Sequence, residues 1–196
     1  MKPLIGTIIQ ARKTSTRFPN KVSEPLFGTT LLEWCVKGVR KAKLVDDIVI
    51  AAPHALGICL NEKLFIGSEA DVLDRYYQCA KEYDFDVIVR ITADCPLISG
   101  YEIDRCINSF LQEDYDYVTN CPAMPDGFDV EVFSFESLFE AWSEAKESYD
   151  REHVTPYIKN NSRCLYLNSP KLSVDTREDL DEIKRYLSYQ TEASWA

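Results

Sequence analysis

The chain of 196 residues has no apolar run that approaches the roughly 18 residues needed to cross a membrane. Its first residues run into a predicted strand and a cationic loop, so we expect neither a cleavable signal nor contact with a membrane. The seven cysteines form no C-x-x-C pair and have no metal-like spacing, and their number is odd. We therefore expect free thiols and a cytoplasmic location.

Positive side chains are outnumbered by negative ones, 22 Lys and Arg against 32 Asp and Glu, so the formal net charge is −10. Nucleic-acid-binding proteins present a basic face, so we expect no nucleic-acid partner. The distribution is uneven: residues 1–43 hold nine Lys and Arg against two Asp and Glu, whereas the remainder holds thirteen against thirty. The length suits a single domain over residues 1–190, followed by a frayed tail at 191–196.

Much of the N-terminal charge lies in a loop that follows a short apolar run at residues 4–9, which predicts a buried strand. The loop carries Arg12, Lys13, Arg17 and Lys21. Ligands of open α/β sheets bind beyond the carboxyl ends of the strands, and Arg and Lys form strong charge-assisted bonds to phosphate. The loop therefore predicts a polyphosphate site, with a solvated basic loop as the alternative.

Hydrophobic periodicity predicts alternating strands and helices along the chain. The expected strands cover about 47–52, 64–66, 86–91, 115–120 and 126–135, and the expected helices begin near 30, 71, 101 and 176. The first helix should run to about Lys43 behind a capping box at Thr30 and Glu33. A strand, a helix and a strand in succession imply a right-handed crossover between parallel strands, so we expect an α/β, Rossmann-like fold with a mostly parallel sheet.

Three acidic residues follow or alternate along the later strands. Asp94 comes just past the predicted central strand and precedes Pro96, where it can reach Mg²⁺ on a bound triphosphate or simply close an Asx-turn. Asp129 and Glu131 fall on one face of the predicted strand at 126–135, where they line a polar pocket or face water.

The loop sequence A-R-K-T-S-T-R-F-P-N-K resembles the A-R-x-x-S-x-R-x-P-x-K signature of the CMP-sugar synthetases. These are cytidylyltransferases that activate 3-deoxy-manno-octulosonate and N-acylneuraminate, and the likeness is strongest to their spore-coat-polysaccharide type. Five later stretches resemble the family in the same order: G-S-E-A-D-V-L-D-R-Y, R-I-T-A-D-C-P-L-I, G-F-D-V-E-V-F-S-F, Y-D-R-E-H-V-T-P-Y-I and V-D-T-R-E-D-L. Two positions differ from the family pattern: Ala93 stands where the family usually has glycine, and Arg177 stands where it usually has proline.

The resemblance implies a glycosyltransferase-A-like, three-layer domain that transfers CMP from CTP to an acidic sugar with Mg²⁺, as a homodimer, in surface-polysaccharide or glycan precursor synthesis. It implies catalytic roles for Arg12, Arg17, Lys21 and Asp94. It implies that the nucleotide is bound by Gln10, Ala11, Arg12, Arg17, Lys21, Ser68, Asp71, Arg75 and Thr92. It implies an acceptor site at Asp129, Glu131, Glu152 and His153. It implies Mg²⁺ ligands at Asp94 and Asp175.

Each assignment has a plainer alternative. Asp71 and Asp175 suit helix caps, Arg75 suits an exposed charge, and a single histidine such as His153 is more often structural than catalytic. A methyl group at Ala93 can crowd the nucleotide.

Two other functions remain open. A glycosyltransferase would use an Asp-x-Asp motif, and the chain has two, at residues 84–86 and 114–116, although both begin predicted strands on the wrong side of the sheet. A non-catalytic nucleotide-binding member of the family is the other alternative, because the segments before Phe65 and between Arg163 and Ser173 are shorter than usual.

Overall fold

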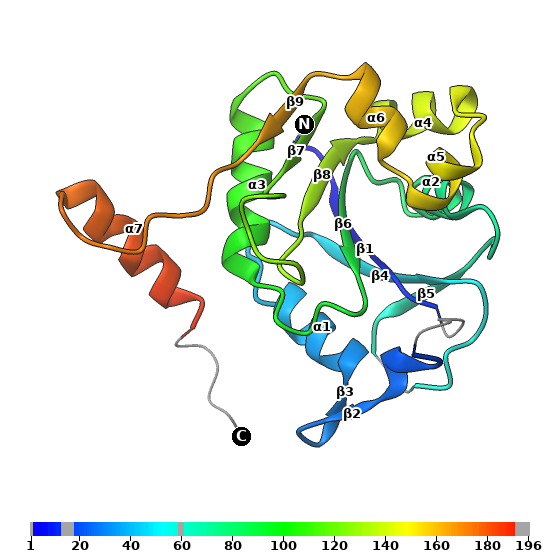
Figure 1. Ribbon diagram of the computed structural model, residues 1–196, viewed down its shortest axis with the longest axis horizontal. Coiled ribbons are helices and arrows are strands. Elements are labelled where there is room, and N and C mark those ends of the chain that lie inside the picture. The colour runs from blue at the N-terminus through cyan, green and yellow to red at the C-terminus, as the bar shows by residue number, and fades with distance from the viewer. Residues whose placement is uncertain (1, 13–17, 59–60, 191–196) are drawn as a thin grey trace.

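The computed structural model describes residues 2–12, 18–58 and 61–190 (Figure 1). A seven-stranded sheet has the order β5-β4-β1-β6-β8-β7-β9. Its strands are β1 (Ile5–Gln10), β4 (Asp47–Ala52), β5 (Lys63–Ile66), β6 (Val87–Thr92), β7 (Tyr117–Thr119), β8 (Glu131–Ser134) and β9 (Cys164–Tyr166). Only β8 runs against its neighbours, so the predicted α/β fold with a mostly parallel sheet is confirmed.

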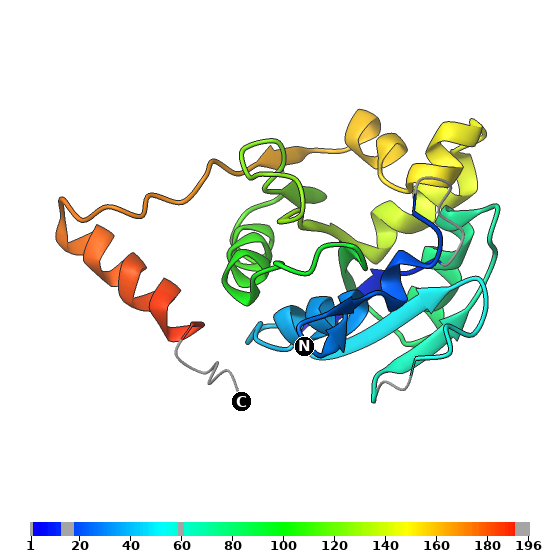
Figure 2. The same cartoon turned by 60° about the horizontal axis from the view of Figure 1, so that its bottom comes forward.

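Helices lie on both faces of this sheet (Figures 1 and 2). They are α1 (Leu31–Val39), α2 (Val72–Glu82), α3 (Gly100–Gln112), α4 (Phe135–Glu144), α5 (Ser148–His153), α6 (Pro156–Asn161) and α7 (Arg177–Ser188). A 3-10 turn, η1 (Lys21–Ser23), and a small hairpin of β2 (Pro25–Leu26) and β3 (Thr29–Thr30) precede α1.

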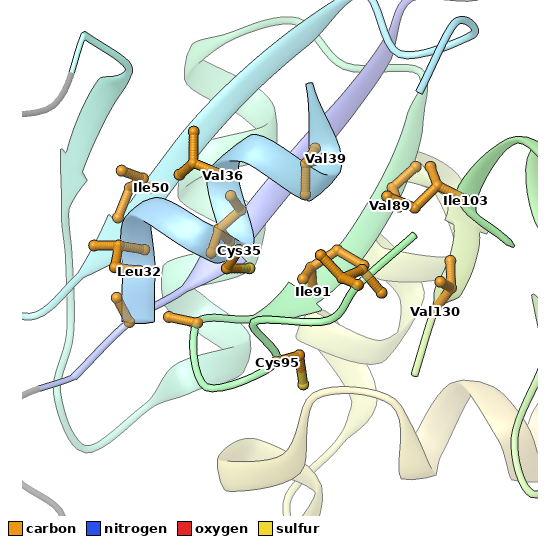
Figure 3. Packing of buried hydrophobic residues seen from close by; sticks show 14 of the residues in the cluster. Leu32, Cys35, Val36, Val39, Ile50, Val89, Ile91, Cys95, Ile103 and Val130 are labelled. Carbon is orange, nitrogen blue, oxygen red and sulfur yellow. The ribbon is translucent and has the colours of Figure 1, made fainter. Parts of the chain in front are cut away.

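The alternation of side chains along the strands creates a separate core on each face. On one face, Val89 and Ile91 of β6 pack with Leu32 and Val36 of α1 and Ile103 of α3 (Figure 3). The opposite face packs against α2, α4 and α6, and its buried members include Ile8, Ile88, Tyr76, Leu138 and Ile158. Three layers follow, with the central strand β1 buried on both sides.

The first helix is shorter than predicted. The capping box at Thr30 and Glu33 is present, but α1 ends at Val39 rather than near Lys43. The chain turns there because it meets the start of α3: a Cβ atom at Gly100 would lie 2.5 Å from the backbone carbon of Lys41. Only a glycine permits such a close approach of backbones.

The predicted strand at 126–135 is also shorter, because β8 begins only at Glu131. Before it, the side chain of Asn120 takes over the role of a strand partner. Its amide nitrogen donates to the carbonyl oxygen of Phe128 at 2.9 Å, and its amide oxygen accepts from the backbone N–H of Val130 at 2.9 Å. Asn120 is fully buried, so these bonds satisfy a segment that would otherwise leave polar backbone unpaired.

After β9 an extended segment carries the chain away from the sheet, and α7 then runs back toward the domain, with its backbone standing apart from that of α3 (Figures 1 and 2). The return is fixed by Tyr189, whose hydroxyl donates to Asp104 at 2.6 Å, and by the ring of Tyr101, which packs edge-on against that of Tyr186 at 5.1 Å. None of the helices in the described ranges is long and apolar enough to span a bilayer.

Candidate active site

A small pocket of about 140 Å³ lies at the carboxyl ends of β1 and β6. Its lining includes five of the residues predicted from the sequence: Gln10, Arg12, Lys21, Thr92 and Asp94. The two strands are paired in parallel with Gln10 opposite Thr92, so the loops that follow them leave the sheet side by side. This is the crevice in which open α/β sheets bind their ligands.

The pocket holds an ion pair between Lys21 and Asp94. Lys21 comes from η1 and Asp94 from the turn after β6, where the backbone N–H of Cys95 donates to the carbonyl oxygen of Thr92 at 3.1 Å. Burial raises the pKa of Asp94, but the hydrogen bond and charge of Lys21 outweigh it, so the pKa is lowered overall. The Asp94 side chain, 39% exposed, is therefore an ionised oxygen ligand open to the solvent.

Of the other loop residues expected to bind the nucleotide, Ala11 and Arg12 belong to the part of the chain that the structure describes. The Arg12 side chain is exposed at the pocket, and Ala11 is buried beside it, with its backbone N–H donating to the carbonyl oxygen of Ala51 at 3.0 Å. Arg17 falls in the range 13–17, outside the described residues, so its role stays a prediction.

Ala93, where the resembled family has glycine, causes no visible conflict. Its side chain belongs to the buried apolar cluster on the α1 face, and its backbone N–H donates to the carbonyl oxygen of Gln10 at 2.9 Å. Among the described residues with a positive φ, Ala93 does not occur. Ala93 thus packs in the core and also lines the pocket, its φ needs no glycine, and whether its methyl group crowds a nucleotide stays a prediction.

The stretch at Ser68 to Arg75 forms the start of α2. Asp71 caps the helix by accepting from the backbone N–H of Asp74 at 2.9 Å, and the Ser68 hydroxyl accepts from the N–H of Asp71 at 3.0 Å. Asp71 also accepts from the Nε of Arg151 at 2.9 Å and forms a second bond to its Nη2. Helix capping, the plainer alternative for Asp71, is confirmed, and the contact joins two of the family-like motifs.

Arg75 is not the exposed charge that was its plainer alternative. Its side chain is 1% exposed, and one guanidinium nitrogen donates to the carbonyl oxygen of Ser68. Nε and Nη2 are buried without a hydrogen-bond acceptor among the described residues. Burial lowers the pKa of Arg75, and the charge of Arg12 lowers it further. Arg75 is thus a buried cation that forms no ion pair among the described residues, although the charge of Glu69 raises its pKa in part, and it lies within electrostatic range of Arg12.

The residues expected at the acceptor site fall into two groups. Glu152 and His153 are exposed at the end of α5, where the His153 ring packs beside Tyr149 at 4.5 Å. Asp129 precedes β8 and accepts from the thiol of Cys121 at 2.6 Å. Burial and this bond together raise the pKa of Cys121 to about 12. Their contacts to an acceptor stay predictions.

Glu131 is bound entirely within the protein. The side chain pairs with Arg90 and with Lys159, the latter at 2.7 Å. It also accepts from the hydroxyls of Tyr117 at 2.5 Å and Thr155 at 2.8 Å. Burial raises the pKa of Glu131, but the charges of Arg90 and Lys159 outweigh it and lower the pKa to about 2. Glu131 is therefore an ionised hub between β6, β7 and α6.

A strained turn lies next to this hub. Val154 is a buried β-branched residue with φ 71° and ψ −57°, and the backbone N–H of Thr155 donates to the carbonyl oxygen of His153 at 2.8 Å. This three-residue γ-turn belongs to the rare, strained kind. A valine holds a positive φ only where its surroundings enforce it, and the Thr155–Glu131 bond is one such constraint.

Asp175 does not line the pocket that contains Asp94. It lies in the segment before α7, where its side chain is 72% exposed and pairs with Lys171 at 2.9 Å. No three His, Cys, Asp or Glu side chains cluster in the described ranges in a way that suits a metal. Magnesium often uses one or two carboxylates together with substrate phosphates and water, so Asp94 beside an anion pocket fits that ion.

Sequence reasoning missed Arg90, Lys159 and Arg151. Arg90 had a signal, because a charged residue inside the apolar strand V-I-V-R-I needs a buried partner. The other two had none, because both lie on polar helix surfaces in the sequence and meet Glu131 and Asp71 only in the fold.

A mostly parallel sheet with a cationic, carboxylate-bearing pocket at its carboxyl edge is typical of α/β proteins that bind anionic ligands such as nucleotides. The sequence model of a family described as cytidylyltransferase matches residues 7–193. The chain therefore belongs to the cytidylyltransferase family of nucleotidyltransferases, which confirms the resemblance drawn from the motifs.

Two relatives and one solved structure show the extent of the likeness. The uncharacterized protein MJ1063 of Methanocaldococcus jannaschii is 41% identical, over 95% of this chain and 83% of its own length. The spore coat polysaccharide biosynthesis protein SpsF of Bacillus subtilis is 33% identical, over 90% and 83%. The structure of a cytidylyltransferase from Leptospira borgpetersenii is similar with a TM-score of 0.81 and 30% identity, over 95% and 87%.

Proposed function

We propose that the protein transfers CMP from CTP to a hydroxyl of a small acidic sugar and releases pyrophosphate, in the synthesis of a surface-polysaccharide or glycan precursor. In this reaction the sugar oxygen bonds to the α-phosphorus, the bond from that phosphorus to the bridging oxygen breaks, and pyrophosphate leaves with the electron pair. The hydroxyl proton is lost to solvent or to the leaving group. The single observation that carries the proposal is the pocket that gathers Gln10, Arg12, Lys21, Thr92 and Asp94.

The chain's own cations would supply most of the catalysis. Arg12 and Lys21, with Arg17 from the same loop, are proposed to hold the triphosphate and to offset charge on the leaving pyrophosphate. The pocket of 140 Å³ suits a phosphate group rather than a whole nucleotide. From the motif resemblance we propose that the remainder of the nucleotide lies near Ser68 and Asp71. Positioning and charge stabilisation together account for most of the rate in phosphoryl transfer.

Magnesium is the proposed cofactor. Asp94 would hold it in the pocket, and Asp175, which does not line that pocket, is the proposed second ligand by the motif resemblance alone. When bound, the ion would neutralise phosphate charge as a Lewis acid. Lys21 pairs with the Asp94 carboxylate, so under this proposal Lys21 would turn to a phosphate oxygen when Asp94 holds the ion.

Asp129, Glu152 and His153 are proposed to meet the acceptor, because they lie in the two family-like motifs after β6. As the natural acceptor is an acidic sugar under this proposal, candidates are sugar acids with a free anomeric hydroxyl. We also propose a homodimer and a cytoplasmic location. The location is supported by six free cysteines among the described residues, of which four are buried.

The glycosyltransferase alternative is weakened by the position of its motif. Asp86 precedes β6 and accepts from the backbone N–H of Leu4 at 2.7 Å, while Asp116 precedes β7 and accepts from the N–H of Arg163 at 3.0 Å. Both strands run in the same direction, so these aspartates lie at the amino edge, opposite the pocket. They are used in structural bonds.

The first test is calorimetric titration of the protein with CTP, UTP, ATP and GTP, each with and without Mg²⁺. We expect Mg²⁺-dependent binding that prefers CTP, followed by pyrophosphate release when sugar acids are supplied. Binding without pyrophosphate release from any sugar acid would favour the non-catalytic alternative. Failure to bind all four nucleotides would refute the proposal.

The second test is Asp94→Ala. Because its side chain is partly exposed and its one ionic partner among the described residues is Lys21, the substitution should leave the fold intact while turnover falls at least 10²–10³-fold, as expected for loss of one preorganised charge stabiliser. Circular dichroism checks the fold. Full activity of the variant with Mg²⁺ would remove the metal assignment.

A further inference from the structure

Arg90 is the one charged residue within β6, on the face of the sheet that packs against α2. Its neighbours across the sheet are Ile8 on β1 and Glu131 on β8. The guanidinium pairs with Glu131 through Nη1 and reaches the side-chain oxygen of Gln10 through Nη2 at 3.4 Å. It therefore links a residue of the nucleotide pocket to a buried carboxylate.

This contact fixes which end of the Gln10 amide faces the pocket. A guanidinium has only hydrogen-bond donors, so it must meet the amide oxygen and not the amide nitrogen. The NH₂ group, at the other end of the planar amide, is left to donate elsewhere. No acceptor for that NH₂ group lies within hydrogen-bond distance among the described residues, and Gln10 lines the pocket beside Arg12 and Thr92.

Arg90 is itself held rigidly. Its partner Glu131 is 5% exposed and is fixed from three further directions by Tyr117, Thr155 and Lys159. The Tyr76 ring lies 5.9 Å from the guanidinium carbon on the α2 side. Neither Arg90 nor Glu131 is free to turn toward another group.

Stability alone does not account for the arrangement. Buried ionic groups are often replaced by apolar residues of similar volume without loss of stability. The Nε of Arg90 is buried with no hydrogen-bond acceptor among the described residues, which is an additional unfavourable term. A side chain that is 17% exposed and leaves this donor unmet is better explained by the contact that its Nη2 makes with Gln10.

We propose that Arg90, anchored by Glu131, is a positioning residue that turns the amide of Gln10 so that its NH₂ group donates to a phosphoryl oxygen of the bound nucleotide. The inference rests on the proposed function and names a specific donor within that site. Under this inference Glu131 does not contact the sugar acceptor directly, because its oxygens already bind four protein groups. Its role is instead to hold Arg90 in place.

The test compares Gln10→Met, Arg90→Lys and the double variant. Gln10→Met keeps the length of the side chain and removes the donor, whereas Arg90→Lys keeps a charge for Glu131 but lacks the fork that reaches Gln10 as well. Binding of CTP and of inorganic pyrophosphate, each with Mg²⁺, is measured by calorimetry. Thermal unfolding of each variant confirms that it is folded at the temperature of the titration.

We expect each single variant to bind both ligands roughly 10-fold or more weakly, because a hydrogen bond to a charged group is lost. The double variant should bind no more weakly than the weaker single one, because both changes remove the same donor. Arg105→Lys is the matched control: Arg105 pairs with Glu102 on α3, at 2.7 Å, and its replacement should leave both affinities unchanged.

Additive losses in the double variant, or unchanged binding by folded Gln10→Met or Arg90→Lys, would overturn the inference. The two ligands separate this inference from the proposed function. A wild-type protein that binds pyrophosphate but no CTP refutes the proposed function, and the non-additive pattern on pyrophosphate then still supports the role of Arg90. A wild-type protein that binds neither ligand overturns both.

Discussion

Replacing Arg75 with methionine should stabilise the protein and weaken its binding of polyphosphate. The two unmet donors of Arg75 are buried, and each buried, unsatisfied polar group costs about 1–3 kcal/mol. Methionine keeps the aliphatic stem that lies against Gly67, so little packing is lost. The substitution also removes the hydrogen bond to the carbonyl oxygen of Ser68, which lowers the gain in stability by about 1 kcal/mol.

The net gain in the free energy of unfolding is therefore about 1–5 kcal/mol. For a domain of this size it corresponds to a rise of about 2–20 °C in Tm. In contrast, loss of a cation from a phosphate site should weaken binding of pyrophosphate by roughly 10-fold or more. A variant that is more stable than the wild type but binds pyrophosphate more weakly identifies a residue that is retained for binding.

Differential scanning calorimetry and titration with pyrophosphate measure the two quantities. Arg151→Met is the matched control for stability, because Arg151 lies near the same helix start but is fully paired with Asp71 and the carbonyl oxygen of Trp142. Its replacement should lower Tm. The reasoning would be refuted by an Arg75→Met protein that unfolds more easily and binds pyrophosphate as well as the wild type.

Two further predictions concern the Glu131 hub. The folded-state pKa of Glu131, about 2, lies below its ordinary value of 4.5, so the folded protein binds fewer protons than the unfolded chain. This carboxylate therefore contributes stability, about 3 kcal/mol, that is complete above pH 4.5 and is lost as the pH falls toward 2. Urea unfolding between pH 7 and pH 3 should show that Glu131→Gln is destabilised at neutral pH and that its deficit shrinks in acid; a constant deficit would contradict the charge assignment. At Val154, whose φ is 71°, Val154→Gly should be more stable than Val154→Ala by about 1 kcal/mol, opposite to the usual order in helices and strands, and equal or reversed stabilities would show that the turn is unstrained.

Much of the fold was predictable because its strands are short apolar runs in regular alternation with capped helices. The positions of β1, β4 and β6 followed from those runs, and the pocket followed from the rule that loops after parallel strands meet at one edge. Lys21 and Asp94, 73 residues apart, meet because each follows one of two paired strands. Topology alone brings them together.

The contacts of the charged residues were not predictable in the same way. Both Arg75 and Arg151 lie in family-like motifs, yet only Arg151 pairs with Asp71, and Arg75 is buried without a carboxylate. The alternation of residues along β8 allows Glu131 to face a pocket, but α6 covers that face of the strand, and Lys159 of α6 pairs with the Glu131 carboxylate. These outcomes depend on how helices far along the chain pack over the sheet, which local periodicity does not specify.

The two faces of the sheet differ in a way that bears on function. The buried charges on the side of α1 and α3 are the carboxylates of Glu102 and Asp104 on α3, whereas the face under α2 and α4 encloses Arg75, Arg90 and Glu131. An apolar core on both faces would satisfy the fold, so these charges are retained against a cost in stability. Two of the three are cations, and Arg75 interacts with Arg12 while Arg90 contacts Gln10, both of which line the pocket. The charged face therefore places a surplus of positive charge beneath the pocket, as a polyphosphate ligand requires in a chain whose net charge is −10.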